Sequence, residues 1–350
     1  MIAKKIKVLI TDDSLLFRNV LKNQLSKDSG IEVVGMAVDP IDAMEKIKVL
    51  NPDIITLDIE MPKMDGLTFI KKLMAEHPVK VVLVSSMNIS VFDALQSGAV
   101  DFVKKPTMSS GNEVDIFIRE LITKIKIASI AKLVTYKNTK KEAQVGTVGS
   151  TARLSQLIKS SAKQVIAIGA STGGTEATLK VLKELPKDTP GIVVTQHMPP
   201  GFTKMYADRL DKICIMEVRE AANGDRVETG VVLIAPGDNQ MKLMKDDKGY
   251  YVSCKPGEKV SGHCPSVDVL FNSVAEAAGK NSVGIILTGM GKDGAQGLMN
   301  MKKAGAYTIG QDEKSSVVYG MPMVAYNIGA VAVQASIENI AEILIRHLNK

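Results

Sequence analysis

The chain has 350 residues, 45% of them hydrophobic, and exceeds the length at which one hydrophobic core usually stops growing, so two domains are expected. The net charge of +6 comes from one segment: between Leu121 and Lys163 nine Lys or Arg residues accompany the single acid Glu142, a local charge of +8. The rest of the chain therefore carries about −2, which argues against a general nucleic-acid-binding surface. No apolar run is long enough to cross a bilayer, no signal region precedes the first predicted strand, and the three cysteines lack Cys-x-x-Cys spacing, so a cytoplasmic protein is expected.

Residues 1–125 alternate predicted strands with amphipathic segments of helix length. The predicted strands are Ile6–Thr11, Ile31–Val38, Asp53–Leu57, Val79–Ser85 and Ala99–Val103. Five such repeats are typical of a doubly wound (βα)5 parallel sheet, the first domain of an α/β protein.

Apolar periodicity is lost between roughly Lys132 and Ser160, which predicts a basic linker over residues 126–160. A second αβ series fills residues 161–350, with predicted strands at Val165–Ile168, Ile192–Thr195, Ile213–Val218, Val231–Ala235, Val283–Leu287 and Ala306–Ile309. Between the fourth and fifth of these, Met241–Met244 and Tyr250–Ser253 flank a turn and predict an antiparallel hairpin. The second domain is therefore expected to be an α/β/α sandwich with a mostly parallel sheet and an inserted antiparallel hairpin.

Polar side chains end four strands of the first domain: Asp12 and Asp13, Asp58, Ser85 and Lys105. Because the carboxyl ends of parallel strands share one edge, three carboxylates, a hydroxyl and an ammonium are expected in one pocket. Crowded carboxylates favour Mg²⁺, and such a carboxylate can attack phosphorus while the lysine and the serine bind the transferred oxygens. The alternative is that the acids only cap helices.

The stretches Thr11–Ser14, Leu57–Gly66 and Phe102–Pro106 resemble the receiver domain of two-component response regulators. The resemblance implies Asp58 as the phosphoacceptor and a Mg²⁺ site formed by Asp12, Asp13 and Asp58. It also implies Ser85 as the switch hydroxyl, Lys105 as the phosphate-sensing lysine and Phe102 as the switch aromatic.

A possible hydrolytic triad is spread over the second domain, because Ser171, His197 and Asp293 each follow a β-branched or aliphatic run. The glycine-rich turn around Ser171 leads into a helix, whose N–H groups suit a developing oxyanion. His197 is the only one of four histidines at a predicted strand end, and a serine nucleophile needs such a base. Asp293 would orient the imidazole, and four other acids compete for that role: Asp225, Asp238, Asp268 and Asp312.

Other interpretations remain open at this point. The glycine-rich turn also fits a tight turn or a phosphate cradle, and it lacks the Gly-x-Ser-x-Gly pattern. A DNA-binding regulator would explain the basic linker, but the second domain lacks a compact helix-turn-helix pattern. A nucleotide-binding module would need a P-loop or a Gly-x-Gly-x-x-Gly motif, and the glycine-rich region contains neither of these two motifs. A metal site at Cys254, His263 and Cys264 lacks zinc-ligand spacing and a fourth ligand.

Five stretches of the second domain resemble the catalytic domain of the CheB family of chemotaxis protein-glutamate methylesterases: Gly169–Ala177, Thr195–Phe202, Ala235–Gly237, Pro265–Asp268 and Leu287–Gly294. The resemblance implies Ser171 as nucleophile, His197 as general base and acid, Asp293 as orienting carboxylate, and Met290 and Thr172 in support of the oxyanion position.

The same resemblance implies demethylation of glutamate methyl esters and deamidation of glutamines on chemoreceptors. It implies phosphorylation by the histidine kinase CheA, inhibition by the receiver until Asp58 is phosphorylated, and no metal for ester hydrolysis. One departure is that Cys264 stands where relatives commonly carry arginine.

Overall fold

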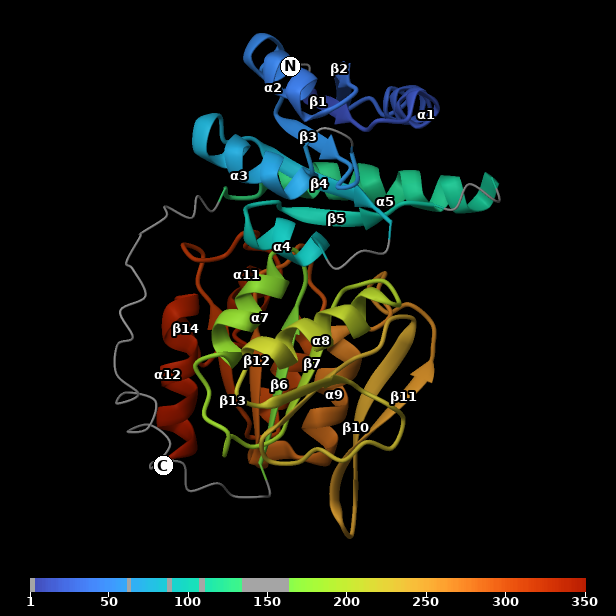
Figure 1. The fold of residues 1–350 in the computed structure, drawn as a ribbon. Coiled ribbons are helices and arrows are strands. Elements are labelled where there is room, and N and C mark those ends of the chain that lie inside the picture. Colours follow the sequence, from blue (N-terminus) through green and yellow to red (C-terminus); the bar gives the residue numbers. More distant parts are fainter. Residues whose placement is uncertain (1–3, 62–63, 87–89, 107–110, 134–163) are drawn as a thin grey trace. The chain divides into compact units, whose positions relative to one another are not determined.

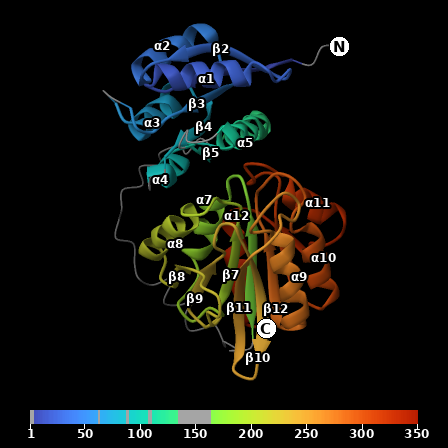
Figure 2. The same ribbon diagram turned by 90° about the vertical axis from the view of Figure 1, so that its right-hand side faces the viewer.

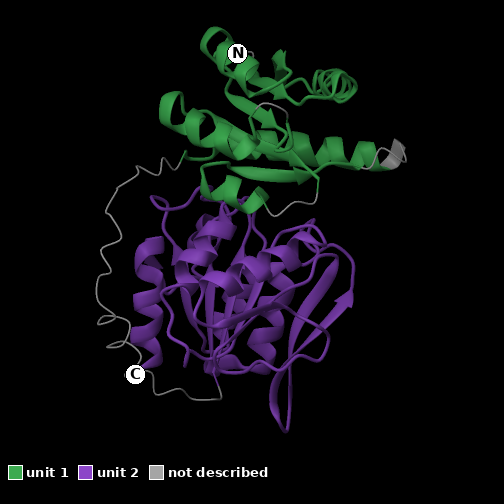
Figure 3. Ribbon diagram, in the orientation of Figure 1, with its two compact units in different colours: residues 1–138 green, residues 139–350 purple. Residues whose placement is uncertain are grey.

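The computed structural model describes residues 4–61, 64–86, 90–106, 111–133 and 164–350. The chain divides into two compact units, residues 1–138 and 139–350 (Figure 3). Each unit contains its own sheet, and the two-domain α/β architecture predicted from the sequence is confirmed.

The first unit is a five-stranded sheet with strand order β2-β1-β3-β4-β5, in which every neighbouring pair is parallel (Figure 1). Its strands are β1 (Ile6–Thr11), β2 (Ile31–Ala37), β3 (Ile54–Leu57), β4 (Lys80–Ser85) and β5 (Asp101–Lys104). Its helices are α1 (Leu15–Leu25), α2 (Pro40–Leu50), α3 (Gly66–Glu76), α4 (Ser90–Gln96) and α5 (Gly111–Ile130). Helices α1 and α5 cover one face of the sheet, and α2, α3 and α4 cover the other.

Local sequence signals fix where these helices begin and end. The Ser14 hydroxyl accepts a hydrogen bond from the Phe17 N–H and caps α1. Asp39 caps α2 in the same way, Pro40 occupies the first helical position, and Asn51 ends α2 in the left-handed conformation. Because each cap follows a strand closely, the strand ends and helix starts gather at one edge of the sheet.

Helix α5 continues five residues into the segment predicted as a linker, which begins at residue 126. The remainder of that linker, from residue 134 to residue 160, lies outside the described residues. Within the described residues, no helix combines the length and the apolar character that a membrane span requires.

The second unit contains a seven-stranded sheet of order β14-β13-β12-β6-β7-β9-β8, in which all neighbouring pairs are parallel. Its strands are β6 (Val165–Ala170), β7 (Ile192–Gln196), β8 (Glu217–Glu220), β9 (Val231–Ile234), β12 (Ser282–Ile286), β13 (Tyr307–Gln311) and β14 (Val333–Ala335). The central strands β6, β7 and β12 are buried along their whole length, as expected for a sheet with helices on both faces.

Helices cover both faces of this sheet (Figure 2). One layer holds α7 (Gly174–Leu182), α8 (Phe202–Ile213) and α12 (Ile337–Leu348), and the other holds α9 (Val267–Ala277), α10 (Ala295–Lys303) and α11 (Met321–Asn327). The core under α9 and α10 includes the fully buried side chains of Phe271 and Leu298. Burying each such side chain stabilises the fold by about 1.5–3 kcal/mol.

The predicted hairpin is present but longer, with β10 (Asn239–Asp246) and β11 (Gly249–Pro256) forming a separate two-stranded antiparallel sheet. It packs on α9, and the Leu243 N–H donates to the Ser273 hydroxyl at 2.9 Å.

One strand prediction needs correction, and one strand was missed. The strand predicted at Ile213–Val218 is β8, which starts at residue 217, because α8 extends to Ile213 and the apolar side chains of Ile213 and Ile215 are exposed. Strand β14 was not predicted, since three residues carry too little periodicity to be recognised.

Candidate active site

Ser171 and His197 occupy equivalent places on neighbouring strands of the second sheet. Ala170, the last residue of β6, pairs with Gln196, the last residue of β7. The residues that follow them, Ser171 and His197, therefore lie side by side. The His197 N–H donates to the Ala170 carbonyl at 3.1 Å. Neighbouring strands are about 4.8 Å apart, so the two side chains emerge at adjacent points of the carboxyl edge.

Asp293 reaches His197 from the loop after β12. His197 Nε2 donates to Asp293 Oδ2 at 2.7 Å, and both side chains are almost completely buried. None of the four competing acids takes this position; Asp268, whose own N–H donates to Asp293, accepts from the Gly297 N–H at 2.7 Å. The hydrogen bond with His197 is therefore made by Asp293, the acid that the family resemblance implied, and not by the four acids that the residue pattern left open.

The carboxylate of Asp293 is surrounded by donors at the start of α9. Its Oδ1 accepts from the Ser266 hydroxyl at 2.7 Å and from the Asp268 N–H at 3.1 Å, and its Oδ2 also accepts from the Val267 N–H at 2.7 Å. Burial alone would raise the pKa of Asp293, but the hydrogen bonds from His197, Ser266 and Val267 outweigh it and hold the pKa below its ordinary value. Asp293 is therefore ionised and fixed in place.

The second nitrogen of His197, Nδ1, is buried and has no hydrogen-bond partner among the described residues. Within the described residues Ser171 Oγ likewise makes no hydrogen bond to His197, although strand pairing places Ser171 beside His197. Catalytic hydrogen bonds are often long before substrate binds, so the serine hydroxyl remains the natural donor to this nitrogen.

The loop that carries Met290 borders Ser171. A Cβ atom added to Gly289 would lie 2.7 Å from Ser171 Cβ, so this loop and Ser171 are closely packed. The Met290 side chain is exposed, whereas Thr172 is buried and its carbonyl accepts from the Thr288 hydroxyl at 3.0 Å. Both residues predicted to support an oxyanion thus flank Ser171.

Three further side chains touch this site and were not predicted as site residues. Gln196 Nε2 donates to the Ser171 carbonyl at 2.9 Å and to the His197 carbonyl at 3.3 Å. Ser266 contacts Asp293 as described, and the His263 ring lies against His197. Ser266 carried a local sequence signal, since it precedes a helix as an N-cap serine, and Gln196 lies in one of the stretches that resemble the family; His263 carried neither.

The predicted residues of the receiver pocket also lie together. Lys105 Nζ donates to Asp12 Oδ2 and to Asp58 Oδ2, each at 2.7 Å. Burial raises the pKa of Asp58, the hydrogen bond and charge of Lys105 oppose that rise, and the charge of Asp12 adds to it. Ser85 is fully buried, and its hydroxyl has no partner among the described residues.

One oxygen from each of Asp12, Asp13 and Asp58 lies within 4.8 Å of the others, and hard carboxylate oxygens are suitable Mg²⁺ ligands. Among the described residues this is the one group of three or more such side chains, and Cys254, His263 and Cys264 do not come together in such a group. Phe102 is buried and contacts Phe92 of α4 edge-on, with ring centroids 6.5 Å apart.

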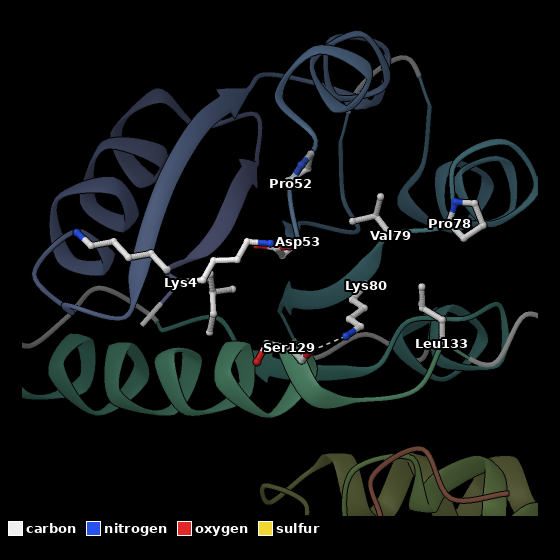
Figure 4. A pocket seen from close by; sticks show the side chains of 10 residues that line it. Lys4, Pro52, Asp53, Pro78, Val79, Lys80, Ser129 and Leu133 are labelled. Atoms are coloured by element: carbon white, nitrogen blue, oxygen red, sulfur yellow. Dashed lines mark hydrogen bonds and ion pairs between the residues drawn. The ribbon is translucent and has the colours of Figure 1, made fainter. Parts of the chain in front are cut away.

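A cavity of about 310 Å³ lies elsewhere in the first unit (Figure 4). Its lining includes Lys4, Pro52, Asp53 and Lys80, which belong to the amino-terminal edge of the sheet, and Lys80 Nζ donates to the Ser129 carbonyl. No predicted site residue lines this cavity.

Comparisons with known proteins match both units. Residues 166–344 match the CheB methylesterase family and residues 8–111 match the response regulator receiver domain. The chain is 53% identical over 352 residues to a protein-glutamate methylesterase/protein-glutamine glutaminase of Syntrophomonas wolfei and 46% identical over 353 residues to one of Syntrophotalea carbinolica, with 99% of each chain covered in both cases.

Among solved structures, the catalytic domain of Thermotoga maritima CheB methylesterase matches with 37% identity and a TM-score of 0.52, over 53% of this chain and 98% of that one. The family match, these identities over nearly the whole length and the fold lead to one conclusion: the chain belongs to the CheB methylesterase family, with a response regulator receiver domain in front of the methylesterase domain.

Proposed function

We propose that this protein hydrolyses methyl esters of glutamate side chains, and deamidates selected glutamine side chains, on chemoreceptors. The observation that carries the proposal is the buried His197–Asp293 hydrogen bond at 2.7 Å, placed at the strand end beside Ser171. An imidazole held by an ionised carboxylate next to a serine is the arrangement that activates a hydroxyl for acyl transfer.

Ser171 Oγ attacks the ester carbonyl while its proton passes to Nδ1 of His197. Asp293 stabilises the resulting imidazolium through the hydrogen bond from Nε2, and the backbone around Thr172 and Met290 supports the negative charge on the carbonyl oxygen. His197 then gives the proton to the departing methoxide, so that methanol leaves and a glutamyl ester of Ser171 remains. Water, deprotonated by His197, cleaves this ester and restores the serine. Deamidation follows the same steps with ammonia as the leaving group.

Asp58 is the proposed switch. Asp12, Asp13 and Asp58 would hold Mg²⁺, which when bound supplies charge neutralisation for phosphoryl transfer. Phosphorylation of Asp58 would replace its carboxylate ion pair with Lys105 by a phosphoryl group, whose added charge Lys105 and the buried Ser85 hydroxyl are placed to bind. Phe102, packed on α4, links this pocket to a helical surface of the receiver.

We also propose that the phosphodonor is the histidine kinase CheA. A histidine kinase takes its phosphoryl group from ATP, so we place this activity in the cytoplasm, where ATP is available. In the unphosphorylated state the receiver inhibits the methylesterase domain, and phosphorylation of Asp58 relieves the inhibition.

The test is methanol release from methylated receptor membranes by the full chain, with and without a small phosphodonor and Mg²⁺, and by a fragment beginning near Ser160. The fragment and the phosphorylated chain should both exceed the unphosphorylated chain. Equal rates in all three would remove inhibition by the receiver, and no methanol from any of them would remove the esterase proposal.

A further inference from the structure

The imidazole of His197 is covered on one face by a second histidine. The rings of His197 and His263 are stacked with centroids 3.6 Å apart and an angle of 9° between their planes. His263 belongs to the loop between β11 and α9, which is distant in sequence from His197.

The turn itself fixes the position of His263. Ser261 and Gly262 both have positive φ, 53° and 85°, as the two central residues of a type I′ turn require. The N–H and carbonyl groups of Val260 and His263 exchange two hydrogen bonds of 3.0 Å across it. His263 is therefore the residue that leaves a tight, doubly hydrogen-bonded turn.

A buried glutamine of β10 anchors this loop. Gln240 Nε2 donates to the His263 carbonyl at 3.3 Å and to the Glu258 carbonyl at 2.9 Å, while its Oε1 accepts from the Ser266 N–H at 2.9 Å. Since the Ser266 hydroxyl donates to Asp293, one anchored loop contacts both the base, through His263, and the acid, through Ser266.

Among the described residues the His197 ring makes one hydrogen bond, to Asp293, and this bond alone leaves the ring able to tilt about the Nε2–Oδ2 direction. A flat ring stacked on its face removes that freedom. We propose that His263 is a positioning residue for the general base: its ring holds the plane of the His197 imidazole so that Nδ1 stays available to Ser171 through both halves of the reaction. This inference rests on the proposed function.

Two substitutions separate a positioning role from a general effect on folding. His263→Ala removes the stacked ring, and His263→Phe keeps a flat ring without nitrogens. His347→Ala is the matched control, because the ring of His347 in α12 also stacks on an aromatic ring, that of Tyr307, with centroids 3.9 Å apart and 4° between the ring planes. Tyr307 starts β13, so this pair lies at the opposite edge of the sheet from the candidate active site.

Steady-state methanol release is measured with the phosphorylated full chain on methylated receptor membranes. His263→Ala should lower kcat by about 10- to 100-fold with little change in KM, because misplacing a catalytic group by a fraction of an ångström affects the transition state more than substrate binding. His263→Phe should restore kcat to within about threefold of wild type, and His347→Ala should leave kcat unchanged. A low-field proton resonance from His197 Nε2–H should persist in His263→Phe and broaden in His263→Ala.

A wild-type kcat in His263→Ala, or a kcat in His263→Phe as low as in His263→Ala, would overturn the inference. If His263→Ala does not fold, as seen in its thermal melt, the kcat and the proton resonance of His263→Phe decide alone. Absence of methanol release by the wild-type chain would instead overturn the proposed function and this inference with it.

Discussion

Replacing Asp293 by asparagine tests the orientation of the general base. The carboxylate accepts four hydrogen bonds, two at each oxygen, whereas an asparagine amide accepts at one oxygen and donates from its nitrogen. If the amide oxygen keeps the Ser266 and Asp268 donors, the amide nitrogen faces the Val267 N–H and His197. His197 must then accept at Nε2, so its proton moves to Nδ1, the nitrogen that should receive the Ser171 proton.

The size of both effects follows from this geometry. A triad histidine in the wrong tautomer loses roughly 10⁴-fold in kcat, so we expect a loss of about 10³- to 10⁴-fold for Asp293→Asn. The orphaned Val267 N–H costs about 1–3 kcal/mol of unfolding free energy. For a domain of this size that lowers the melting temperature by about 2–4 °C per kcal/mol.

Acid sensitivity gives a second readout of the same substitution. The pKa of Asp293 lies below its ordinary value of 3.8, so its stabilising contribution is present above the unfolded-state pKa and is lost as pH falls through the folded-state pKa. Asp293→Asn should therefore lose less stability than wild type when the pH is lowered through this range. Methanol release and chemical denaturation at several pH values measure both effects, and a kcat within tenfold of wild type would refute the assigned role of Asp293.

Three more substitutions probe the two sites. Burial raises the pKa of Asp58 and Lys105 opposes that rise, so Lys105→Ala should raise the pKa of Asp58 further. The pH below which the rate of phosphorylation by a small phosphodonor falls should therefore be higher in Lys105→Ala than in wild type, and a lower pH would contradict this. Gly289→Ala places a Cβ atom 2.7 Å from Ser171 Cβ, and both kcat and unfolding free energy should fall, the latter by about 1–3 kcal/mol in a denaturant titration. Gln196→Met removes the donor to the Ser171 carbonyl and should lower kcat about tenfold in a folded protein; an unchanged kcat would show that this contact does not position the nucleophile.

The residues that form the centre of each site were predictable from the sequence for a simple reason. Parallel strands in an α/β sheet end at one edge, so a polar residue directly after a buried apolar run belongs to that edge. This applies to Asp58 and Ser85 in the first unit and to Ser171 and His197 in the second. The strand order was not needed for this inference, because the edge is shared by all strands.

The residues that hold the centre in place were not predictable, because their roles depend on contacts between distant segments. His263 and Gln196 act through a ring face and a side-chain amide, and neither leaves a periodic trace in the sequence. For Asp293 the residue pattern alone left four other acids open, the family resemblance implied Asp293, and the hydrogen bond with His197 agrees with it. The start of β8 was misplaced because exposed apolar residues at the end of α8 imitate the beginning of a strand.

The most direct test of the nucleophile is methanol release from methylated receptor membranes by Ser171→Ala and by the wild-type chain, each phosphorylated and each shown to be folded. We expect the substitution to lower the rate by at least about 10³-fold, leaving only what binding and oxyanion support supply. A Ser171→Ala protein that released methanol at close to the wild-type rate would contradict the assignment of Ser171 as the group that attacks the ester.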